Sequence, residues 1–358
     1  MFRYLLSILL LVVLLPVGTA LAQEAPTPET ASIPSAYQLS GFNFEYQGWN
    51  NCGPATQTTA LTYFGYADNQ LRAAQWLKPN NEDKNVTPQE MVAFVNTQVP
   101  ETPVFALNRH GGTLGLLKTL IANNYPVIIE KGYDPPPHDK GWMGHYLLVV
   151  GYDDARQMFI THDSYLGPNQ EYTYDYLDEF WRHFNRSYIV LYESGAEPAL
   201  LALLGDDADP QQNALRALEV ARAEASTNPQ DPFAWFNIGT SYVLLADSYQ
   251  QEAYEYAAVA YDEARKYDLP WRMMWYQFGP FEAYNAVGRY EDTLQLTAAN
   301  LNDGGGHWVE ETFYYAAVAR EEQGDTVRAL ENYRQAAFLN PNFIAAREAR
   351  DRLSNTTS

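Results

Sequence analysis

The C-terminal half of the sequence repeats itself at a nearly constant spacing, and this repeat restricts the possible folds more than any other feature. Gly324 lies 36 residues after Gly288, and each unit carries small and large apolar residues at similar offsets. Helical periodicity continues from Gln211 onward without a convincing strand. A repeat of this length is typical of paired helices that stack on their neighbours, because one pair cannot bury its apolar face alone. We therefore expect an all-α array over residues 211–354.

The positions that recur place small residues where paired helices approach and large residues in the facing gaps. They are Ala217 and Pro229 in a degenerate leading unit, then Trp235, Gly239, Tyr242, Tyr261, Ala264 and Pro270, then Tyr284, Gly288 and Tyr290, and finally Gly324, Ala329, Tyr333, Ala336 and Pro341. These offsets resemble tetratricopeptide repeats, and the resemblance implies a concave surface that binds a peptide or protein segment. A structural spacer or dimerisation arm is the alternative. Five further aromatic residues are expected to pack between helices: Trp271, Trp275, Tyr276, Phe278 and Phe281.

The first half of the chain has a different pattern, with helices before strands. Helical periodicity covers residues 56–66, 70–77 and 113–123, and Thr87-Pro88-Gln89-Glu90 has the sequence of a capping box. Short β-branched runs follow, and a hairpin turn is expected at Asp153–Arg156. The strands expected are residues 37–46, 126–130, 146–152, 158–161 and 186–192. This order indicates an α+β domain over residues 37–194, followed by a linker over residues 195–210.

The N-terminus has the composition of a secretory signal peptide over residues 1–22. Arg3 precedes a short apolar stretch, and Ala20-Leu21-Ala22 supplies the small residues of a cleavage site. Residues 23–36 are rich in Pro, Thr, Ser and Glu and are expected to be a disordered linker. We therefore expect an exported chain, secreted or at the exterior of the cell envelope, with no stable membrane insertion after cleavage.

The charge of the chain excludes two classes of partner. It has 23 Lys and Arg against 44 Asp and Glu, a formal net charge of −21, and the acidic residues are spread over both halves. Such a chain is a poor ligand for nucleic acid or for anionic membrane surfaces. Solubility outside the cell is the simpler explanation for the acidity.

Cys52 is the single cysteine of the chain, so no internal disulfide can form. It follows a turn-rich Gly, Asn and Trp run and precedes Gly53-Pro54 and a predicted helix. The start of a helix favours a thiolate, which is the reactive form of the side chain. A buried, unreactive thiol is the alternative. An unpaired cysteine in an exported chain favours the reactive interpretation.

A thiolate nucleophile needs a base within hydrogen-bond reach and a third group that orients the base. Of six histidines, His145 stands at the start of the predicted strand 146–152. Asp163 follows the strand 158–161, and a hairpin joins the two strands. If the strands pair, His145 and Asp163 lie at the same end of the sheet, whereas Asp153 and Asp154 lie at the hairpin end. His162 should point to the opposite face from Asp163 and is expected to be structural.

Acyl transfer also needs hydrogen-bond donors for the oxyanion that forms on the carbonyl oxygen. The side-chain amide of Gln47, five residues before Cys52, can supply one donor. The backbone N–H of Cys52 can supply a second from the start of the helix. A polar residue at a strand end is the alternative interpretation of Gln47.

Gln47, the run Asn50 to Ala55, and Gly144-His145-Tyr146 with the strand to Asp153, together with Asp163, resemble a papain-like cysteine peptidase domain. The subgroup is similar to the bacteriocin-processing (double-glycine leader) peptidases, family thirty-nine of the cysteine class, over residues 37–193. The resemblance implies Cys52 as nucleophile, His145 as general base and acid, Asp163 as the orienting group and Gln47 in the oxyanion hole. Papain-like enzymes commonly place the glutamine six residues before the cysteine. The fold class expected is therefore an α+β papain-like domain followed by an all-α tetratricopeptide-type repeat domain.

Two functions from different classes follow. The first is an exported cysteine peptidase or amidase whose repeats bind a protein or peptide substrate; acyl transfer to an amine uses the same residues. The second is a peptide-binding protein with a peptidase-like domain and no catalysis. The sequence has no His-x-x-x-His pair, spaced cysteine set or phosphate-binding loop, so neither a metal nor another cofactor is expected.

Overall fold

The computed structural model describes residues 33–134 and 141–356. The signal peptide expected at residues 1–22 and most of the linker at residues 23–36 lie outside this range. Within it, seven strands form one antiparallel sheet in the order β2-β7-β3-β4-β5-β6, and β1 pairs with β4. Their bounds are β1 Ala36–Gln38, β2 Val104–Arg109, β3 Val127–Tyr133, β4 Met143–Asp153, β5 Met158–Asp163, β6 Gly167–Thr173 and β7 Tyr188–Glu193.

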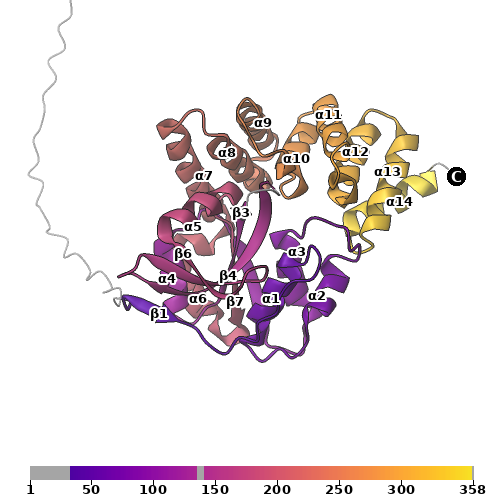
Figure 1. Cartoon of the computed structure of the whole chain (residues 1–358). Helices are drawn as coiled ribbons and strands as arrows, with labels where there is room; N and C mark the ends of the chain where they lie inside the picture. Colours follow the sequence, from indigo (N-terminus) through magenta and orange to yellow (C-terminus); the bar gives the residue numbers. More distant parts are fainter. Residues whose placement is uncertain (1–32, 135–140, 357–358) are drawn as a thin grey trace, which may run out of the picture. The chain divides into compact units, whose positions relative to one another are not determined.

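Helices cover both faces of this sheet, and the apolar side chains of the central strands alternate between two cores. Ile129, Leu147 and Val149 pack on one side with α4 (Leu114–Ala122), α5 (Tyr174–Trp181) and α6 (Glu197–Leu204). Ile128 and Leu148 pack on the other side with α1 (Cys52–Thr62), α2 (Gln70–Leu77) and α3 (Pro88–Gln98). Because both faces are covered, residues 127–129 of β3 and 146–150 of β4 form apolar runs without alternation of polar residues. An α+β architecture is therefore confirmed for this part of the chain (Figure 1).

Local signals predict several of these elements well. The helix expected at residues 70–77 is α2, and Thr87 and Glu90 form both hydrogen bonds of a capping box at the start of α3. The hairpin turn expected at Asp153–Arg156 joins β4 to β5. These features depend on residues that are close in sequence, which is why the sequence alone is sufficient to predict them.

β2 and β6 were not among the expected strands, and two expected segments take a different form. The strand expected over residues 37–46 is limited to β1, because the backbone beyond it bonds to side chains: the N–H of Asn43 donates to Oγ1 of Thr62 at 2.9 Å. Residues 195–210, expected to be a linker, form the 3₁₀ helices η2 (Ser194–Ala196) and η3 (Gly205–Ala208) around α6. Leu200 and Leu204 of α6 are buried in the core of the sheet, so this segment is packed.

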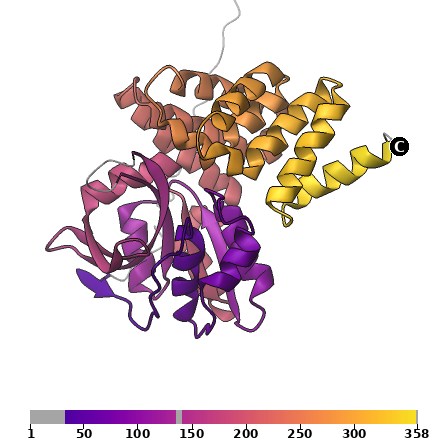
Figure 2. The same cartoon turned by 45° about the vertical axis from the view of Figure 1, so that its right-hand side comes forward.

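The remainder of the chain is helical, as the periodicity predicts, and each helix packs against the next one in sequence. Figures 1 and 2 show this succession from α7 to α14. The bounds are α7 Pro210–Thr227, α8 Pro232–Leu244, α9 Ala246–Ala264, α10 Gly279–Ala286, α11 Tyr290–Leu301, α12 Glu310–Glu322, α13 Thr326–Leu339 and α14 Ile344–Thr356, with 3₁₀ helices η4 Trp271–Trp275 and η5 Gly306–Trp308. No helix of the described segments has the length and apolar composition needed to span a bilayer.

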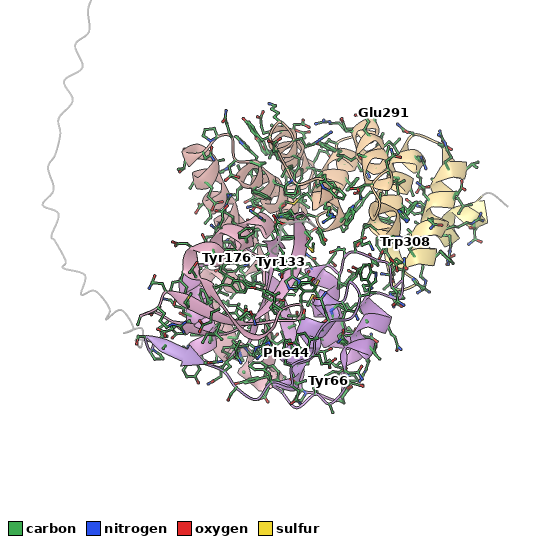
Figure 3. All side chains as sticks on the ribbon, in the orientation of Figure 1. Phe44, Tyr66, Tyr133, Tyr176, Glu291 and Trp308 are labelled. Atoms are coloured by element: carbon green, nitrogen blue, oxygen red, sulfur yellow. The ribbon has the colours of Figure 1, made fainter. Side chains whose placement is uncertain are left out.

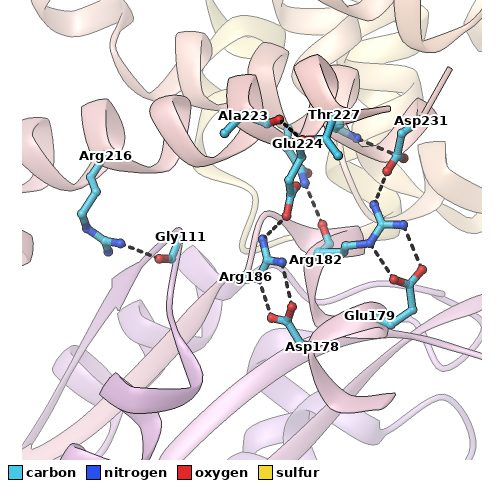
Figure 4. Close-up of polar contacts among 12 residues, drawn as sticks. Gly111, Asp178, Glu179, Arg182, Arg186, Arg216, Ala223, Glu224, Thr227 and Asp231 are labelled. Atoms are coloured by element: carbon cyan, nitrogen blue, oxygen red, sulfur yellow. Dashed lines mark hydrogen bonds and ion pairs between the residues drawn. The ribbon is translucent and has the colours of Figure 1, made fainter. Parts of the chain in front are cut away.

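Ion pairs join the first helices of this series to the sheet-containing part (Figure 4). Arg182, in the 3₁₀ helix η1 (Arg182–Phe184), pairs with Asp231 before α8 at 2.6 Å. Arg186 pairs with Asp178 of α5 at 2.6 Å and with Glu224 of α7 at 2.7 Å. Both arginines are largely shielded from solvent, so these pairs are screened less than pairs on an open surface.

Substitution of Gly239 tests how closely α8 approaches α9. A Cβ at this position in α8 would lie 2.6 Å from Cε1 of the buried Tyr261 in α9. We expect Gly239→Ala to lower the free energy of unfolding by about 1–3 kcal/mol, because overpacking outweighs the better helix propensity of alanine. Denaturant unfolding of the full chain measures this. Gly304→Ala, where a Cβ meets nothing within 4 Å, is the control and should leave stability unchanged. Equal stability of both variants would contradict the packing of α8 on α9.

Candidate active site

Cys52 is the first residue of α1 and is partly exposed. Gln70 at the start of α2 fixes the turn that precedes it. Its Oε1 accepts a hydrogen bond from the backbone N–H of Gly48 at 2.8 Å and from Nδ2 of Asn51 at 3.2 Å. The sulfur is thereby held at the N-terminus of a helix, where the helix dipole favours negative charge.

His145 and Asp163 meet at one end of the sheet. Nε2 of His145, near the start of β4, lies 2.9 Å from Oδ1 of Asp163 at the end of β5, and both side chains are buried. The imidazole is also close enough to Cys52 to lower the pKa of its thiol. Because Asp163 occupies Nε2, Nδ1 is the nitrogen available to the sulfur. The ring of Tyr133 stacks on that of His145 with 4.6 Å between centroids, which restricts its rotation.

Asp163 is itself oriented by several donors. Its Oδ1 accepts hydrogen bonds from the backbone N–H groups of Tyr165 at 2.8 Å and Leu166 at 3.1 Å. The hydroxyl of Tyr172 on β6 donates to Oδ2 at 3.0 Å. A buried carboxylate with this many donors is stabilised in its charged form. Asp163 can therefore hold the imidazole in one orientation.

The electrostatics of the three residues favour a thiolate and an imidazolium. Burial raises the pKa of Cys52, but the hydrogen bond and charge of His145 and the backbone N–H groups of Tyr146 and Gly53 lower it more, so the net pKa is below that of a free thiol. Burial lowers the pKa of His145, but the charge of Asp163 and its hydrogen bond raise it to about 9. Burial raises the pKa of Asp163, and His145 lowers it to well below its usual range.

Gln47 and His162 lie at the edges of this arrangement. Oε1 of Gln47 accepts a hydrogen bond from the hydroxyl of Ser164 at 3.0 Å, so Nε2 is the end of the side chain that can donate to a ligand. The backbone N–H of Gln47 also donates to the carbonyl of Ser164 at 2.8 Å. The ring of His162 packs edge-on against Phe42 at 5.2 Å between centroids. Its Nδ1 accepts from the backbone N–H of Asn169 at 3.2 Å.

Two charged residues of β3 accompany the site and were not predicted. Lys131 is paired across the strands with His145, is fully buried, and has its Nζ within 5.5 Å of four aromatic centroids. Two of these rings, Tyr133 and Tyr176, are labelled in Figure 3. Burial lowers the pKa of Lys131 to about 7, partly offset by the charge of Asp163. Glu130 lines the cavity beside Cys52, and burial together with the Cys52 charge raises its pKa well above the usual range. Both residues lie in a run that is otherwise apolar, which identifies a strand but gives no indication of a site.

Tyr276, which follows η4 in the helical part, lines the cavity at Cys52. It had been expected to pack between helices. The cavity has a volume of about 10 Å³, enough for about one water, and is lined by Cys52, Glu130, Gly144 and Tyr276 among others. The ring lies against Gly144, where a Cβ would be 2.8 Å from its Cδ1. The ring therefore takes up space on this side of the cavity.

Removal of the Tyr276 ring should open this cavity. We expect Tyr276→Ala to increase the rate of Cys52 labelling by a bulky peptidyl electrophile about tenfold relative to labelling by iodoacetamide, since only the larger reagent needs the space. Mass spectrometry of the two adducts over time measures this ratio. Trp271→Ala, at an exposed position of the adjacent η4, is the control. An unchanged ratio in Tyr276→Ala would show that the ring does not restrict access.

Three comparisons with known proteins bear on this part of the chain. A solved structure described as that of a C39-like peptidase from Bacillus anthracis matches with a TM-score of 0.35 and 13% sequence identity, over 44% of this chain and 97% of that chain. A search of curated proteins gave no match. Residues 30–195 match the sequence model of the Peptidase_C39 like family. This segment contains Cys52, His145 and Asp163, and it is this segment that is similar to the C39-like peptidases.

Proposed function

We propose that the chain is an exported cysteine peptidase that hydrolyses amide bonds with Cys52, His145 and Asp163. The observation that supports this most directly is the position of the His145 ring, which lies 2.9 Å from Asp163 and is close enough to Cys52 to lower the pKa of its thiol. A nucleophile, a base and an orienting carboxylate in this order form the constellation of triad hydrolases. The match of residues 30–195 to the Peptidase_C39 like family supports the same reaction class.

In the proposed reaction, the Cys52 thiolate attacks the carbonyl carbon of the substrate amide. The oxyanion that forms accepts hydrogen bonds from Nε2 of Gln47 and from the backbone N–H of Cys52. The His145 imidazolium donates its proton to the leaving amine, the C–N bond breaks and a thioester remains. His145 then takes a proton from water, the hydroxide attacks the thioester, and the carboxylic acid leaves as Cys52 is regenerated.

The helical part would recruit the substrate. We propose that residues 211–354 form a tetratricopeptide-type domain, separate from a peptidase-like domain at residues 37–194, and that its surface binds a protein or peptide. Export after cleavage of residues 1–22 would place the reaction outside the cell, in the secreted or envelope-exterior compartment. Hydrolysis needs no metal or other cofactor in this mechanism, because the thiolate and imidazolium supply the nucleophile and the acid.

Incubation with a thiol-directed peptidyl electrophile and with a peptide library tests the proposal. We expect the full chain to be labelled on Cys52 at neutral pH and to cleave a subset of peptides, and Cys52→Ala to lose both activities. His307→Ala, at an exposed position of η5, is the matched control and should retain both. Labelling of the full chain no faster than that of a free thiol, with no cleavage, would exclude the enzyme.

A peptide-binding function without catalysis is the second candidate. The observation that favours it is the small volume, about 10 Å³, of the cavity at Cys52, which Tyr276 helps to line. For such a protein we expect peptides to bind with equal affinity to the wild type and to Cys52→Ala, and to be recovered intact. Recovery of cleaved peptide from the wild type alone would decide in favour of the peptidase.

A further inference from the structure

Three glutamates of α3 and α12, from distant parts of the sequence, lie close together. Glu90 lies in the first turn of α3, and Glu310 and Glu311 are the first two residues of α12. One carboxylate oxygen of each lies within 4.8 Å of the others. Glu310 is 2% exposed and Glu311 is 8% exposed. Burying several like charges together is strongly unfavourable unless a proton or a cation compensates them.

Within the described segments, hydrogen bonds do not satisfy all the carboxylate oxygens of the three glutamates. Oε2 of Glu310 and Oε2 of Glu311 are buried without a hydrogen-bond partner there. Oε1 of Glu310 accepts one bond, from Nδ2 of Asn340 at 2.7 Å. Oε2 of Glu90 accepts from the backbone N–H and the hydroxyl of Thr87, both at 2.8 Å, in the capping box. Oε2 of Glu310 and Oε2 of Glu311 are thus two buried acceptors in the cluster that have no hydrogen-bond donor.

A fourth buried acidic residue, Asp83, is near enough to interact electrostatically with Glu310 and Glu311. Lys78 interacts with Asp83 in the same way.

We propose that Glu90, Glu310 and Glu311 hold a hard divalent cation of the size of Ca²⁺. Calcium bonds oxygen at about 2.3–2.6 Å, so two of its ligands can be about 5 Å apart, and the three oxygens lie within 4.8 Å of one another. Magnesium keeps several waters and is usually held by one or two carboxylates, so three protein carboxylates fit calcium better. Zinc prefers nitrogen and sulfur, which these residues do not offer. A cation removes the repulsion and gives the unpartnered oxygens a ligand.

Such an ion would bind the sheet-containing part to the helical part, because Glu90 belongs to α3 and the other two ligands belong to α12. Asp83 lies in the loop before α3, and the backbone N–H of Asn85 donates to its Oδ1 at 3.2 Å. Asn85 in turn lines the cavity at Cys52. The cation site and that cavity are therefore joined by one short loop. The cation site does not depend on whether the chain is an enzyme.

Sequence spacing could not indicate this site, since its ligands are carboxylates far apart in the chain, and the absence of His pairs and spaced cysteines excludes only nitrogen and sulfur sites. The test is thermal unfolding of the full chain after dialysis against EGTA, with and without 1 mM CaCl₂ or MgCl₂. We expect CaCl₂ to raise the midpoint by at least about 3 °C and MgCl₂ by less. Calorimetric titration with CaCl₂ should give about one site per chain.

Two substitutions on α12 distinguish calcium binding at this site from the nonspecific calcium binding of an acidic protein. Glu311→Gln should lose most of the calcium shift, yet melt at or above the wild type in EGTA because a repelling charge is gone. Glu322→Gln, at an exposed position of the same α12, should keep the full shift. A wild type with the same midpoint in EGTA and in CaCl₂, and no heat of binding, would overturn the proposal. An equal loss in Glu322→Gln would overturn it as well.

Discussion

Replacement of His145 by alanine is expected to slow the labelling of Cys52 by a peptidyl electrophile at pH 7 at least about 100-fold, in line with the loss of a general base. The imidazole lowers the pKa of the Cys52 thiol and is the proton donor in the proposed reaction, so the substitution reduces the thiolate fraction and removes the donor together. Stopped-flow or quenched labelling followed by mass spectrometry measures the rate. Peptide cleavage should fall in parallel.

His307→Ala controls for the loss of a histidine elsewhere in the chain, since His307 is exposed on η5. It should label at the wild-type rate. Circular dichroism of both variants checks that the fold is kept. A His145→Ala protein that is folded and labels within threefold of the wild type would contradict the role of the imidazole.

Asp163→Asn is expected to reduce the rate of peptide cleavage by about 10- to 100-fold and to narrow the pH range of activity from its alkaline side. Asparagine can accept the hydrogen bond from Nε2 of His145 but has no charge. The charge of Asp163 is the main reason that the pKa of His145 is raised to about 9. Without it the imidazolium deprotonates at a lower pH, and the proton for the leaving amine is lost there. The pH profile of the cleavage rate measures the shift.

Asp153→Asn is the matched control, because Asp153 is at the hairpin end of the same strands. Its Oδ1 also accepts two backbone hydrogen bonds, from Ala155 at 3.0 Å and Arg156 at 3.2 Å. A loss of stability alone would therefore appear in both variants. A pH profile of Asp163→Asn that keeps the wild-type alkaline limit would contradict the electrostatic role of Asp163.

The parts of the fold that the sequence predicts depend on neighbouring residues. The capping box at Thr87, the helix at residues 70–77 and the hairpin before β5 each follow from a local pattern. β6 was missed because Gly167-Pro168-Asn169 has the composition of a turn, and it is held as a strand by its pairing with β5. β1 is short because threonine side chains of α1 take the backbone N–H groups that a longer strand would pair.

In the candidate site, too, some positions follow from the local sequence and others depend on contacts between distant segments. The position of Cys52 at a helix start and the meeting of His145 with Asp163 follow from the order of turn, helix and hairpin. The position of Tyr276 cannot be inferred in this way, because it depends on how η4 packs on β4, and nothing in the local sequence encodes that contact. The surroundings of Lys131 and Glu130 cannot be inferred from the sequence either. What a charged residue in an apolar strand contacts depends on the strands that pair with it.

The pH dependence of Cys52 alkylation by iodoacetamide tests the central claim most directly. A thiol of ordinary pKa, about 8.5, reacts roughly 25-fold faster at pH 8 than at pH 6.5. If His145 lowers the pKa of Cys52, the wild-type rate should change far less over this interval, and His145→Ala should restore the steep dependence. A wild-type rate as steep as that of a free thiol, unchanged in His145→Ala, would contradict a thiolate–imidazolium pair and the peptidase with it.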